Sequence, residues 1–408
     1  MLGYGDRGKD VRDLIPVGVL CARVERLRGR LEKNGLDAVF INAPSTDLHY
    51  FLGIRRGTTS PSDDEKFGDW LHGAVIPVEG KVQVIGPRMG AGPALTQALE
   101  GTPWVDGLRV AGDGILSTYV DPADAVRSAF AAAGSPKRVG IAGTMWSRRL
   151  FALQRAVPDV VVQDAEPVLS GMRAVKDEHE IAAMSRAAAL TERAFAAVLP
   201  QLAVGLTEQE IATELDRLFI VFGAEGSAFP SGVRVTGPSV ESRPVVGRRN
   251  GNTPIQPNTS LTFDMGCVVD GYASDFGRTV FWDEPGQESL ERLDLVMQSR
   301  SACVSAMRGG AVTASELSRI ARKPIEDAGY EEVLLTWVGH GIGLDVHERP
   351  MIRPGDETVL ETGMCLAVEP SCRVPGAPGV RVEDVILVTP EGGNSLHTFS
   401  REPLIMGG

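Results

Sequence analysis

Five potential metal ligands in three short motifs of the C-terminal half constrain this chain more than any other feature. Four carboxylates and one imidazole suit a pair of hard or borderline divalent cations. Their four negative charges would balance two M²⁺ ions and leave the site able to hold a hydroxide. The ligands are Asp264 in Phe-Asp-Met-Gly, Asp275 in Ser-Asp-Phe-Gly, His340 in Gly-His-Gly, Glu369 in Val-Glu-Pro and Glu383 in Val-Glu-Asp.

Each of these residues, taken alone, also has an ordinary structural interpretation. A single Asp beside a strand is usually a turn or cap residue, and a single Glu before proline is usually solvated. The residues around the ligands strengthen the interpretation of all five as one metal site, because three further segments occur with them in the arrangement expected of a single protein family. These are Arg-Ala-Val-Lys at 173–176, Gly-Tyr-Ala-Ser at 271–274 and His-Glu-Arg-Pro at 347–350.

With these segments, residues 173–388 resemble the pita-bread metallopeptidases, which include Xaa-Pro aminopeptidases, Xaa-Pro dipeptidases (prolidases) and methionine aminopeptidases. The extra N-terminal half fits the proline-specific, creatinase-like branch. The resemblance implies an α+β chain of two domains. A small N-terminal creatinase-like α/β domain would span residues 1–170, and a pita-bread catalytic domain with a pseudo-two-fold internal repeat would span residues 171–408.

The resemblance also implies a role for each ligand. Asp264 would bind one metal ion, His340 and Glu369 the other, and Asp275 and Glu383 would bridge the pair. Two metal ions about 3.5–4 Å apart share a water and lower its pKa, so a bridging hydroxide would attack the substrate carbonyl.

Three residues are the expected catalytic residues. Glu369 would also carry a proton to the leaving nitrogen. His347 would donate a hydrogen bond to the substrate carbonyl or the oxyanion. Arg381 lies two residues before Glu383 and so on the same face of a strand. It would hold Asp264 or another carboxylate in place, with an ordinary buried ion pair as the alternative.

The N-terminal half alternates helix and strand patterns. Helices are predicted at residues 23–34, 123–133 and 149–156, strands at 37–41, 138–142 and 160–162, and a hairpin at 74–85. Residues 50–53 are predicted as a strand that leads into a polar loop at 58–70. This domain is expected to act as a scaffold and dimer contact, with the loop either a plain surface loop or a cover for the partner's active site.

A weak internal repeat marks the second half. Thr207 with Glu210, and Thr313 with Glu316, each form the spacing of a capping box at the start of a helix. Long helices are expected before them, at residues 178–199 and 288–307. Two such halves fit the pseudo-two-fold architecture.

One departure from the family pattern concerns residues 237–251. Proline-specific members carry a histidine in this stretch, and this chain has none there. Arg243, Arg248 or Arg249 would replace it as hydrogen-bond donors, but an arginine cannot act as a neutral acid–base group. The departure predicts either slow Xaa-Pro hydrolysis or a substrate whose carboxylate or other anion meets one of these arginines.

The expected function is a dinuclear metallohydrolase, an Xaa-Pro aminopeptidase or dipeptidase acting on a small peptide. Mn²⁺ is the expected metal, and Co²⁺, Zn²⁺ and Fe²⁺ also accept these ligands. The alternative is a non-peptidase of the same fold that cleaves a C–N or related bond in a small metabolite, which the missing histidine favours. A non-catalytic binding module of this fold is a third hypothesis, which the intact ligand set disfavours.

Composition restricts partners and compartment. The net charge of −12 disfavours nucleic acid, and no apolar run is long enough to cross a membrane. The first ten residues lack the apolar core of a signal peptide, and the five cysteines are odd in number and scattered, which favours a cytoplasmic protein with reduced thiols. The family resemblance implies a homodimer. Cys365 and Cys372 lack a CxxC pair, so a structural role is favoured over metal binding.

Overall fold

The computed structural model describes residues 15–43, 45–54, 71–87, 104–111, 120–241, 250–331 and 335–407. The chain divides into two compact units, Met1–Arg173 and Ala174–Gly408. None of the helices in these ranges is long and apolar enough to cross a membrane.

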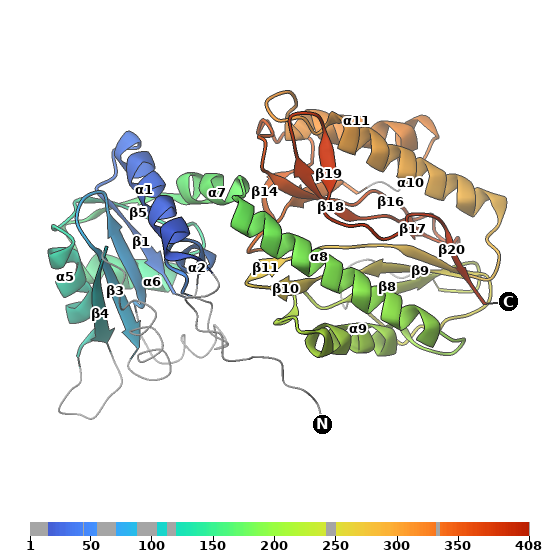
Figure 1. Ribbon diagram of the computed structural model, residues 1–408, viewed down its shortest axis with the longest axis horizontal. Helices are drawn as coiled ribbons and strands as arrows, with labels where there is room; N and C mark the ends of the chain where they lie inside the picture. The colour runs from blue at the N-terminus through green and yellow to red at the C-terminus, as the bar shows by residue number, and fades with distance from the viewer. Residues whose placement is uncertain are drawn as a thin grey trace. The chain divides into compact units, whose positions relative to one another are not determined.

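The first unit is built on one six-stranded mixed sheet (Figure 1). Its strands, in sheet order, are β4 (Val105–Ala111), β3 (Val82–Pro87), β2 (Gly73–Pro77), β1 (Ala38–Asn42), β5 (Arg138–Ile141) and β6 (Val161–Asp164). Its helices are α1 (Val17–Lys33), α2 (Thr46–Leu52), α5 (Pro122–Ala132), α6 (Ser147–Ala156) and α7 (Glu166–Ala174). The apolar sides of α5 and α6 pack on β1 and β5, around Phe40 and Val139. The predicted helices, strands and hairpin of this half therefore form an α/β domain in which helices pack on one sheet.

The strand predicted at residues 50–53 is wrong, because these residues end helix α2. The Oγ of Ser45 accepts a hydrogen bond from the amide of Asp47 and begins the helix, and Gly53 ends it with φ of 70°. Every residue of α2 is buried. The apolar residues at 50–53 therefore show no helical periodicity in the sequence, and the two caps determine that the segment is a helix.

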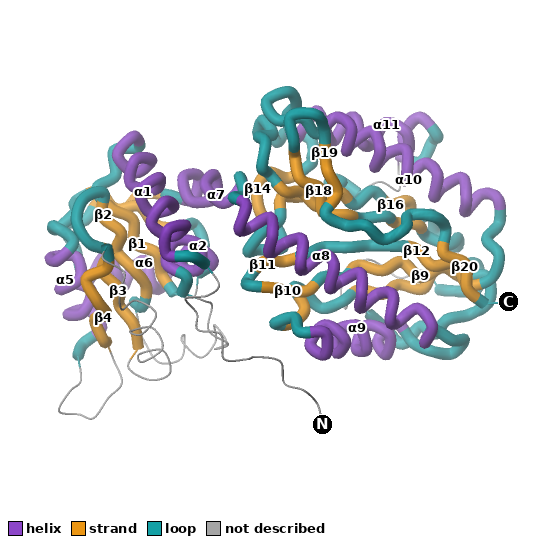
Figure 2. The backbone as a smooth tube through the Cα atoms, viewed as in Figure 1, coloured by secondary structure: helices purple, strands orange, loops and turns teal. Residues whose placement is uncertain are grey.

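The second unit consists of two halves with the same order of elements (Figure 2). The first half has α8 (Glu178–Val198), the short η3 (Leu199–Gln201), α9 (Glu208–Phe222), β7 (Gly226–Ser227), β8 (Gly232–Thr236), β9 (Thr259–Asp264), β10 (Cys267–Val269), β11 (Tyr272–Ala273) and β12 (Thr279–Trp282). The second has α10 (Gln287–Ala306), α11 (Ala314–Asp327), β13 (Gly339–Gly341), β14 (Glu348–Met351), β15 (Cys365–Val368), β16 (Ser371–Cys372), β17 (Val380–Arg381), β18 (Asp384–Val388), β19 (Gly393–Ser395) and β20 (Leu404–Met406). Each half is thus a long helix, a shorter helix and a group of strands.

The predicted capping boxes begin both shorter helices. In α9 the Thr207 side chain accepts from the amide of Glu210, and the Glu210 side chain accepts from the amide of Thr207. Thr313 and Glu316 make the same reciprocal pair in α11. Caps of this kind contribute about 1 kcal/mol each, so both helices begin where the sequence predicts.

Each half has its own apolar core beneath its helix pair. Phe195 and Leu215 of the first pair pack with Phe263 of β9, and Leu317 of the second packs with Leu366 of β15. In Figure 1, α9 lies on one side of the second unit and α10 and α11 on the other, with strands between them. The largest sheet of the first half has the order β20-β12-β9-β8, which includes β20 from the second half, and that of the second half has the order β14-β13-β15-β18-β19. This arrangement leaves the strand ends of both halves to meet between the helix layers.

Candidate metal centre and active site

All five predicted metal ligands lie in or next to strands of the second unit. Asp264 is the last residue of β9, and Asp275 lies in the link between β11 and β12. His340 is the middle residue of β13, Glu369 follows β15 directly, and Glu383 lies between β17 and β18. Two ligands thus come from the first half of the unit and three from the second.

A short backbone bridge joins the two halves at the ligands. The amide of Glu383 donates to the carbonyl of Gly277 at 2.9 Å, and the amide of Gly277 donates back at 3.2 Å. A Cβ on Gly277 would lie 2.9 Å from the Oε2 of Glu383 and from the carbonyl of Phe263. Only glycine allows this approach, which brings Asp275 and Glu383 to one place.

The innermost donor atoms fit a divalent cation. One ligand atom each of Asp275, His340 and Glu383 lies within 4.8 Å of the others, and all three residues are buried. The Oδ1 of Asp275 and the Oε1 of Glu383 are buried with no hydrogen-bond partner among the described residues. Buried carboxylate oxygens normally have a partner, and a divalent metal ion would supply it here.

The ring of His340 is oriented as a metal ligand requires. Its Nδ1 lies 3.0 Å from the carbonyl of Gly341, which can only accept, so Nδ1 carries the proton. Its Nε2 therefore keeps its lone pair, and it lies 3.5 Å from Asp275 and 3.6 Å from Glu369. Burial lowers the pKa of His340, so the ring is neutral at pH 7.

Arg381 joins three of the carboxylates. Its guanidinium lies 3.1 Å from Asp264, 2.7 Å from Glu369 and 2.6 Å from Glu383. Burial alone would lower the pKa of Arg381, but the carboxylates of Asp264, Glu383 and Glu369 raise it well above its ordinary value. Arg381 thus stays charged and fixes the positions of these side chains.

One arginine does not compensate the whole cluster. Burial raises the pKa of Asp275 well above its ordinary value, and the nearby Glu383 and Asp264 add to the rise. Burial also raises the pKa of Glu383 to about 8, against the opposing charge of Arg381, and raises that of Glu369. Carboxyl groups this close cannot all ionise unless further positive charge lies among them.

A cavity of about 360 Å³ opens onto this cluster. His347 lines it and is exposed, with its ring centroid 4.3 Å from that of His340. The ring of Trp337 stacks on that of His347, with their centroids 6.1 Å apart. His347 is therefore accessible to a molecule in the cavity and is held beside the ligand cluster.

A buried ion pair involves Glu348, the residue that follows His347. The Nζ of Lys176 lies 2.9 Å from the Oε2 of Glu348, and both side chains are nearly inaccessible. Glu348 is the neighbour of His347 and begins β14. The Arg-Ala-Val-Lys segment, quoted from the sequence without a role, thus anchors the strand next to His347.

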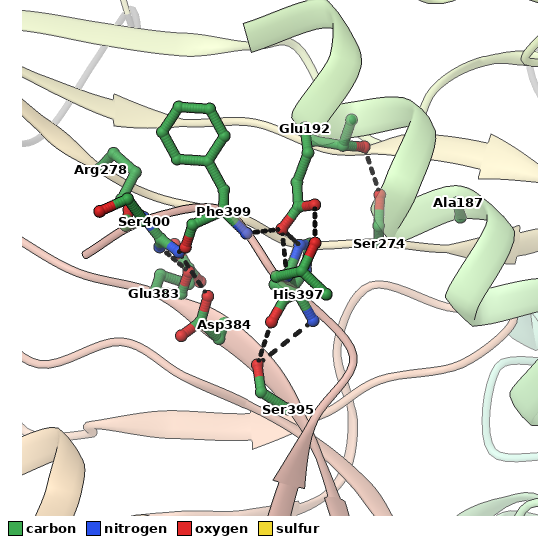
Figure 3. Close-up of polar contacts among 12 residues, drawn as sticks. Ala187, Glu192, Ser274, Arg278, Glu383, Asp384, Ser395, His397, Phe399 and Ser400 are labelled. Atoms are coloured by element: carbon green, nitrogen blue, oxygen red, sulfur yellow. Dashed lines mark hydrogen bonds and ion pairs between the residues drawn. The ribbon is translucent and has the colours of Figure 1, made fainter. Parts of the chain in front are cut away.

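A second charged cluster surrounds Asp384, the residue after Glu383, and Figure 3 shows its contact with Arg278. Asp384 is fully buried, and Arg278, Arg300 and Arg401 lie 2.8, 2.6 and 2.7 Å from its carboxylate. Arg278 also donates to the carbonyl of Glu383 at 2.8 Å. Burial alone would raise the pKa of Asp384, but these arginines lower it. The cluster therefore holds the backbone of Glu383 at a set position.

The same view shows how α8 is tied to the C-terminal segment. Glu192 accepts hydrogen bonds from the amides of Thr398 and Phe399 at 2.6 and 2.7 Å, and it lies 3.5 Å from the ring of His397 (Figure 3). The carbonyl of Ser400, next in the chain, accepts from Arg278 at 3.0 Å. These contacts link α8 to the support of Glu383.

The sequence reasoning missed several cavity residues and named others that the structure does not describe. Arg373, Arg234 and Trp337 line the cavity. Strand alternation from Glu369 onward would have placed Arg373 on the ligand side. The arginines proposed to meet an anion, Arg243, Arg248 and Arg249, and the loop at 58–70 lie outside the described residues.

Comparisons with known proteins agree with this geometry. Residues 182–390 match metallopeptidase family M24, and residues 23–175 match the creatinase/prolidase N-terminal domain. An Xaa-Pro dipeptidase of Lactobacillus delbrueckii subsp. lactis is 33% identical over 261 residues, which are 62% of this chain and 67% of the relative. An Xaa-Pro dipeptidase of Pyrococcus furiosus is 31% identical over 239 residues, 59% of this chain and 67% of the relative.

Solved structures give the same result. The dipeptidase PepE of Mycobacterium ulcerans has a TM-score of 0.80 at 27% identity, over 96% of this chain and 99% of that one. The expected fold, an N-terminal creatinase-like domain followed by a pita-bread domain, is therefore confirmed. The chain belongs to metallopeptidase family M24 and is a metallohydrolase.

Proposed function

We propose that this enzyme hydrolyses the peptide bond before proline in short peptides, as an Xaa-Pro dipeptidase or aminopeptidase that uses two divalent metal ions. The observation that carries the proposal is the convergence of Asp275, His340 and Glu383, whose donor atoms lie within 4.8 Å of one another. Arg381 holds Asp264 and Glu369 beside them. The named Xaa-Pro dipeptidases among the relatives support the preference for proline.

The ligand set supports two ions per chain. Asp264, Asp275, His340, Glu369 and Glu383 are the proposed ligands, and Mn²⁺ is the proposed metal, with Co²⁺, Zn²⁺ and Fe²⁺ as alternatives. When bound, such ions polarise a substrate carbonyl and activate water at neutral pH.

Three side chains would act on the substrate or hold the site. His347 would donate a hydrogen bond to the carbonyl oxygen as it gains negative charge, from its exposed place in the cavity. Glu369 would carry a proton from the attacking water to the leaving nitrogen, which its raised pKa favours. Arg381 would keep Asp264, Glu369 and Glu383 in position and would not itself exchange a proton.

A second function has one observation in its favour. Residues 237–251 contain no histidine, so the sequence offers one neutral donor fewer in this segment than the proline-specific pattern does. A non-peptidase that cleaves a C–N or related bond in a small metabolite is therefore the alternative.

A substrate comparison tests the proposal. Protein loaded with Mn²⁺ should cleave Ala-Pro much faster than Ala-Ala, and a parallel assay of Ala-Pro-Ala distinguishes a dipeptidase from an aminopeptidase. Chelation and His340→Ala should both abolish cleavage. His179→Ala is the matched control, since His179 lies at the start of α8, away from the cavity. The proposal fails if neither Ala-Pro nor Ala-Pro-Ala is cleaved with any of the four metals.

We also propose that the enzyme is a cytoplasmic homodimer. All five cysteines are free thiols, and four are buried, as is usual in a reducing compartment. Light scattering on the purified protein would test the dimer, and a monomer at micromolar concentration would refute it.

A further inference from the structure

Two adjacent residues of helix α8 contact the segments that hold Asp275 and Glu383, the ligands expected to bridge the metal ions. Thr191 contacts the residue before Asp275, and Glu192 contacts the C-terminal residues 397–399 (Figure 3). Neither Thr191 nor Glu192 is among the residues that line the cavity. An effect of these two side chains on the site must therefore act through the metal ligands.

Thr191 holds the residue that directly precedes Asp275. Its side chain is buried, and its Oγ1 lies 2.7 Å from the Oγ of Ser274. The Oγ of Ser274 also accepts a hydrogen bond from the amide of Cys267 at 3.1 Å, and the amide of Ser274 donates to the carbonyl of Cys267 at 3.0 Å. Ser274 is thus fixed through both its side chain and its backbone, so Asp275 begins from a set position.

Glu192 holds a segment on the other side of the ligand cluster. Its Oε1 accepts hydrogen bonds from the amides of Thr398 and Phe399 at 2.6 and 2.7 Å, and its Oε2 accepts from the hydroxyl of Thr398 at 3.0 Å. Burial alone would raise the pKa of Glu192, but His397 and the amide of Phe399 lower it. Glu192 is therefore charged at pH 7, and its hydrogen bonds are of the strong, charge-assisted kind.

Arg278 connects this segment to Glu383. Its guanidinium donates to the carbonyls of Phe399 and Ser400 at 3.2 and 3.0 Å, and to the carbonyl of Glu383 at 2.8 Å. The Arg278 side chain is only 2% exposed, so water does not replace these bonds. A guanidinium is planar and its donors point in fixed directions. The positions of the Phe399 and Ser400 carbonyls therefore help to determine where Arg278 holds Glu383.

Apolar packing keeps α8 against the same segments. Phe195, three residues after Glu192, makes edge-to-face contacts with Phe276 and Phe399, with ring centroids 5.5 and 5.2 Å apart. Phe276 directly follows Asp275, and the guanidinium of Arg278 lies 4.2 Å from the centroid of its ring. Such aromatic contacts have a preferred geometry. They place the hydrogen-bonding side chains of α8 at a fixed distance from both ligand segments.

We propose that Thr191 and Glu192 are positioning residues of the metal centre. Thr191 orients Asp275 through Ser274, and Glu192 orients Glu383 through residues 397–400 and Arg278. The inference rests on the proposed function, since it takes Asp275 and Glu383 as ligands of the two ions. A carboxylate shared by two ions has to meet both at once, so a small displacement weakens two bonds. Groups that orient metal ligands typically change metal affinity by about 10–100-fold.

Metal binding by near-isosteric variants tests the inference. Metal-free protein is titrated with Mn²⁺ in a calorimeter at pH 7, for wild type, Thr191→Val and Glu192→Gln. The matched controls are Thr213→Val in α9 and Glu178→Gln in α8, because both side chains are exposed. Titrations are run well below the melting temperature of every variant, so that each protein is folded throughout.

The inference predicts weaker metal binding by the folded variants. Thr191→Val and Glu192→Gln should each weaken the binding of at least one Mn²⁺ ion by about tenfold or more, and the controls should change it by less than about twofold. The visible spectrum of the Co²⁺-loaded protein should shift in the same two variants, since it reports the geometry of the ligands. A purely structural role would lower the melting temperature and leave affinity and spectrum unchanged, and that result in either folded variant would overturn the role of that residue.

Milder variants keep both parts of the inference open to test if a first variant does not fold. Thr398→Val removes one hydrogen bond to Glu192 at an exposed position, and Ser274→Ala removes the hydroxyl that Thr191 contacts. Each should weaken Mn²⁺ binding by about two- to tenfold, and wild-type affinity would overturn the inference. If Mn²⁺ binds but no Xaa-Pro peptide is cleaved, the proposed function fails, and the titrations still decide the roles of Thr191 and Glu192.

Discussion

Replacing Arg381 with methionine should destabilise the metal-free protein much more than the metal-loaded protein. Methionine preserves most of the volume and removes the charge that lies 3.1, 2.7 and 2.6 Å from Asp264, Glu369 and Glu383. Removal of one partner from a buried ion pair costs about 3–5 kcal/mol, because the remaining charge stays buried without compensation. Glu383 already holds a proton at pH 7 in the metal-free protein, because its pKa is raised to about 8, so the lower part of that range is expected at pH 7.

Bound metal ions change the expected cost. Divalent ions among the same carboxylates would supply the missing positive charge. The loss of unfolding free energy caused by Arg381→Met should therefore fall to less than about half of its metal-free value, and it would come mainly from lost packing and hydrogen bonds. Lowering the pH should also reduce the destabilisation that Arg381→Met causes in the metal-free protein, because protonated carboxyl groups need no neighbouring cation.

Urea denaturation gives the comparison directly. Wild type, Arg381→Met and the exposed control Arg217→Met are unfolded with chelator at pH 7 and pH 5, and with saturating Mn²⁺ at pH 7. The control should behave as wild type in all three conditions. Equal destabilisation of Arg381→Met with and without metal would refute the view that Arg381 neutralises the ligand carboxylates.

Three further predictions concern catalysis, pH and support of the site. His347→Ala should keep its metal content and melting temperature and lose about 10²-fold or more in kcat; normal turnover would remove His347 from the mechanism. Glu383, with its pKa raised from 4.5 to about 8, holds a proton in the folded metal-free protein that the unfolded chain releases. Metal-free stability should therefore fall as pH rises through that window, and metal binding at pH 7 should release protons, which calorimetry in buffers of different ionisation enthalpy would detect; no proton release would contradict the assignment. Lys176→Met should destabilise the enzyme by about 3–5 kcal/mol by leaving the buried Glu348 without the charge of Lys176, and double replacement with Glu348→Gln should recover part of this loss; a neutral single variant would show that the pair does not support β14.

Local signals in the sequence predicted the elements of the fold well. The capping boxes at Thr207 and Thr313 begin helices where expected, because both halves of each signal lie within four residues. Residues 50–53 were assigned wrongly because α2 is buried on all sides. An apolar run without a polar face has no period, and only the caps at Ser45 and Gly53 distinguish helix from strand.

The supports of the site could not be predicted in the same way. Asp384 follows Glu383 directly, yet its partners Arg278, Arg300 and Arg401 are spread along the chain. Burial of such a charge depends on how distant segments meet, which no local pattern encodes. Arg373 was within reach of strand alternation, but the burial of its Nε without a hydrogen-bond partner among the described residues is a property of the folded cavity.

The most direct test of the central claim is an anomalous diffraction measurement on crystals of the Mn²⁺-loaded protein. The account predicts two manganese peaks per chain among Asp264, Asp275, His340, Glu369 and Glu383, which lie in or next to strands of the second unit. Asp275 and Glu383 should lie between the two peaks. A single peak, or peaks at other residues, would contradict the assignment of this cluster as a dinuclear metal centre.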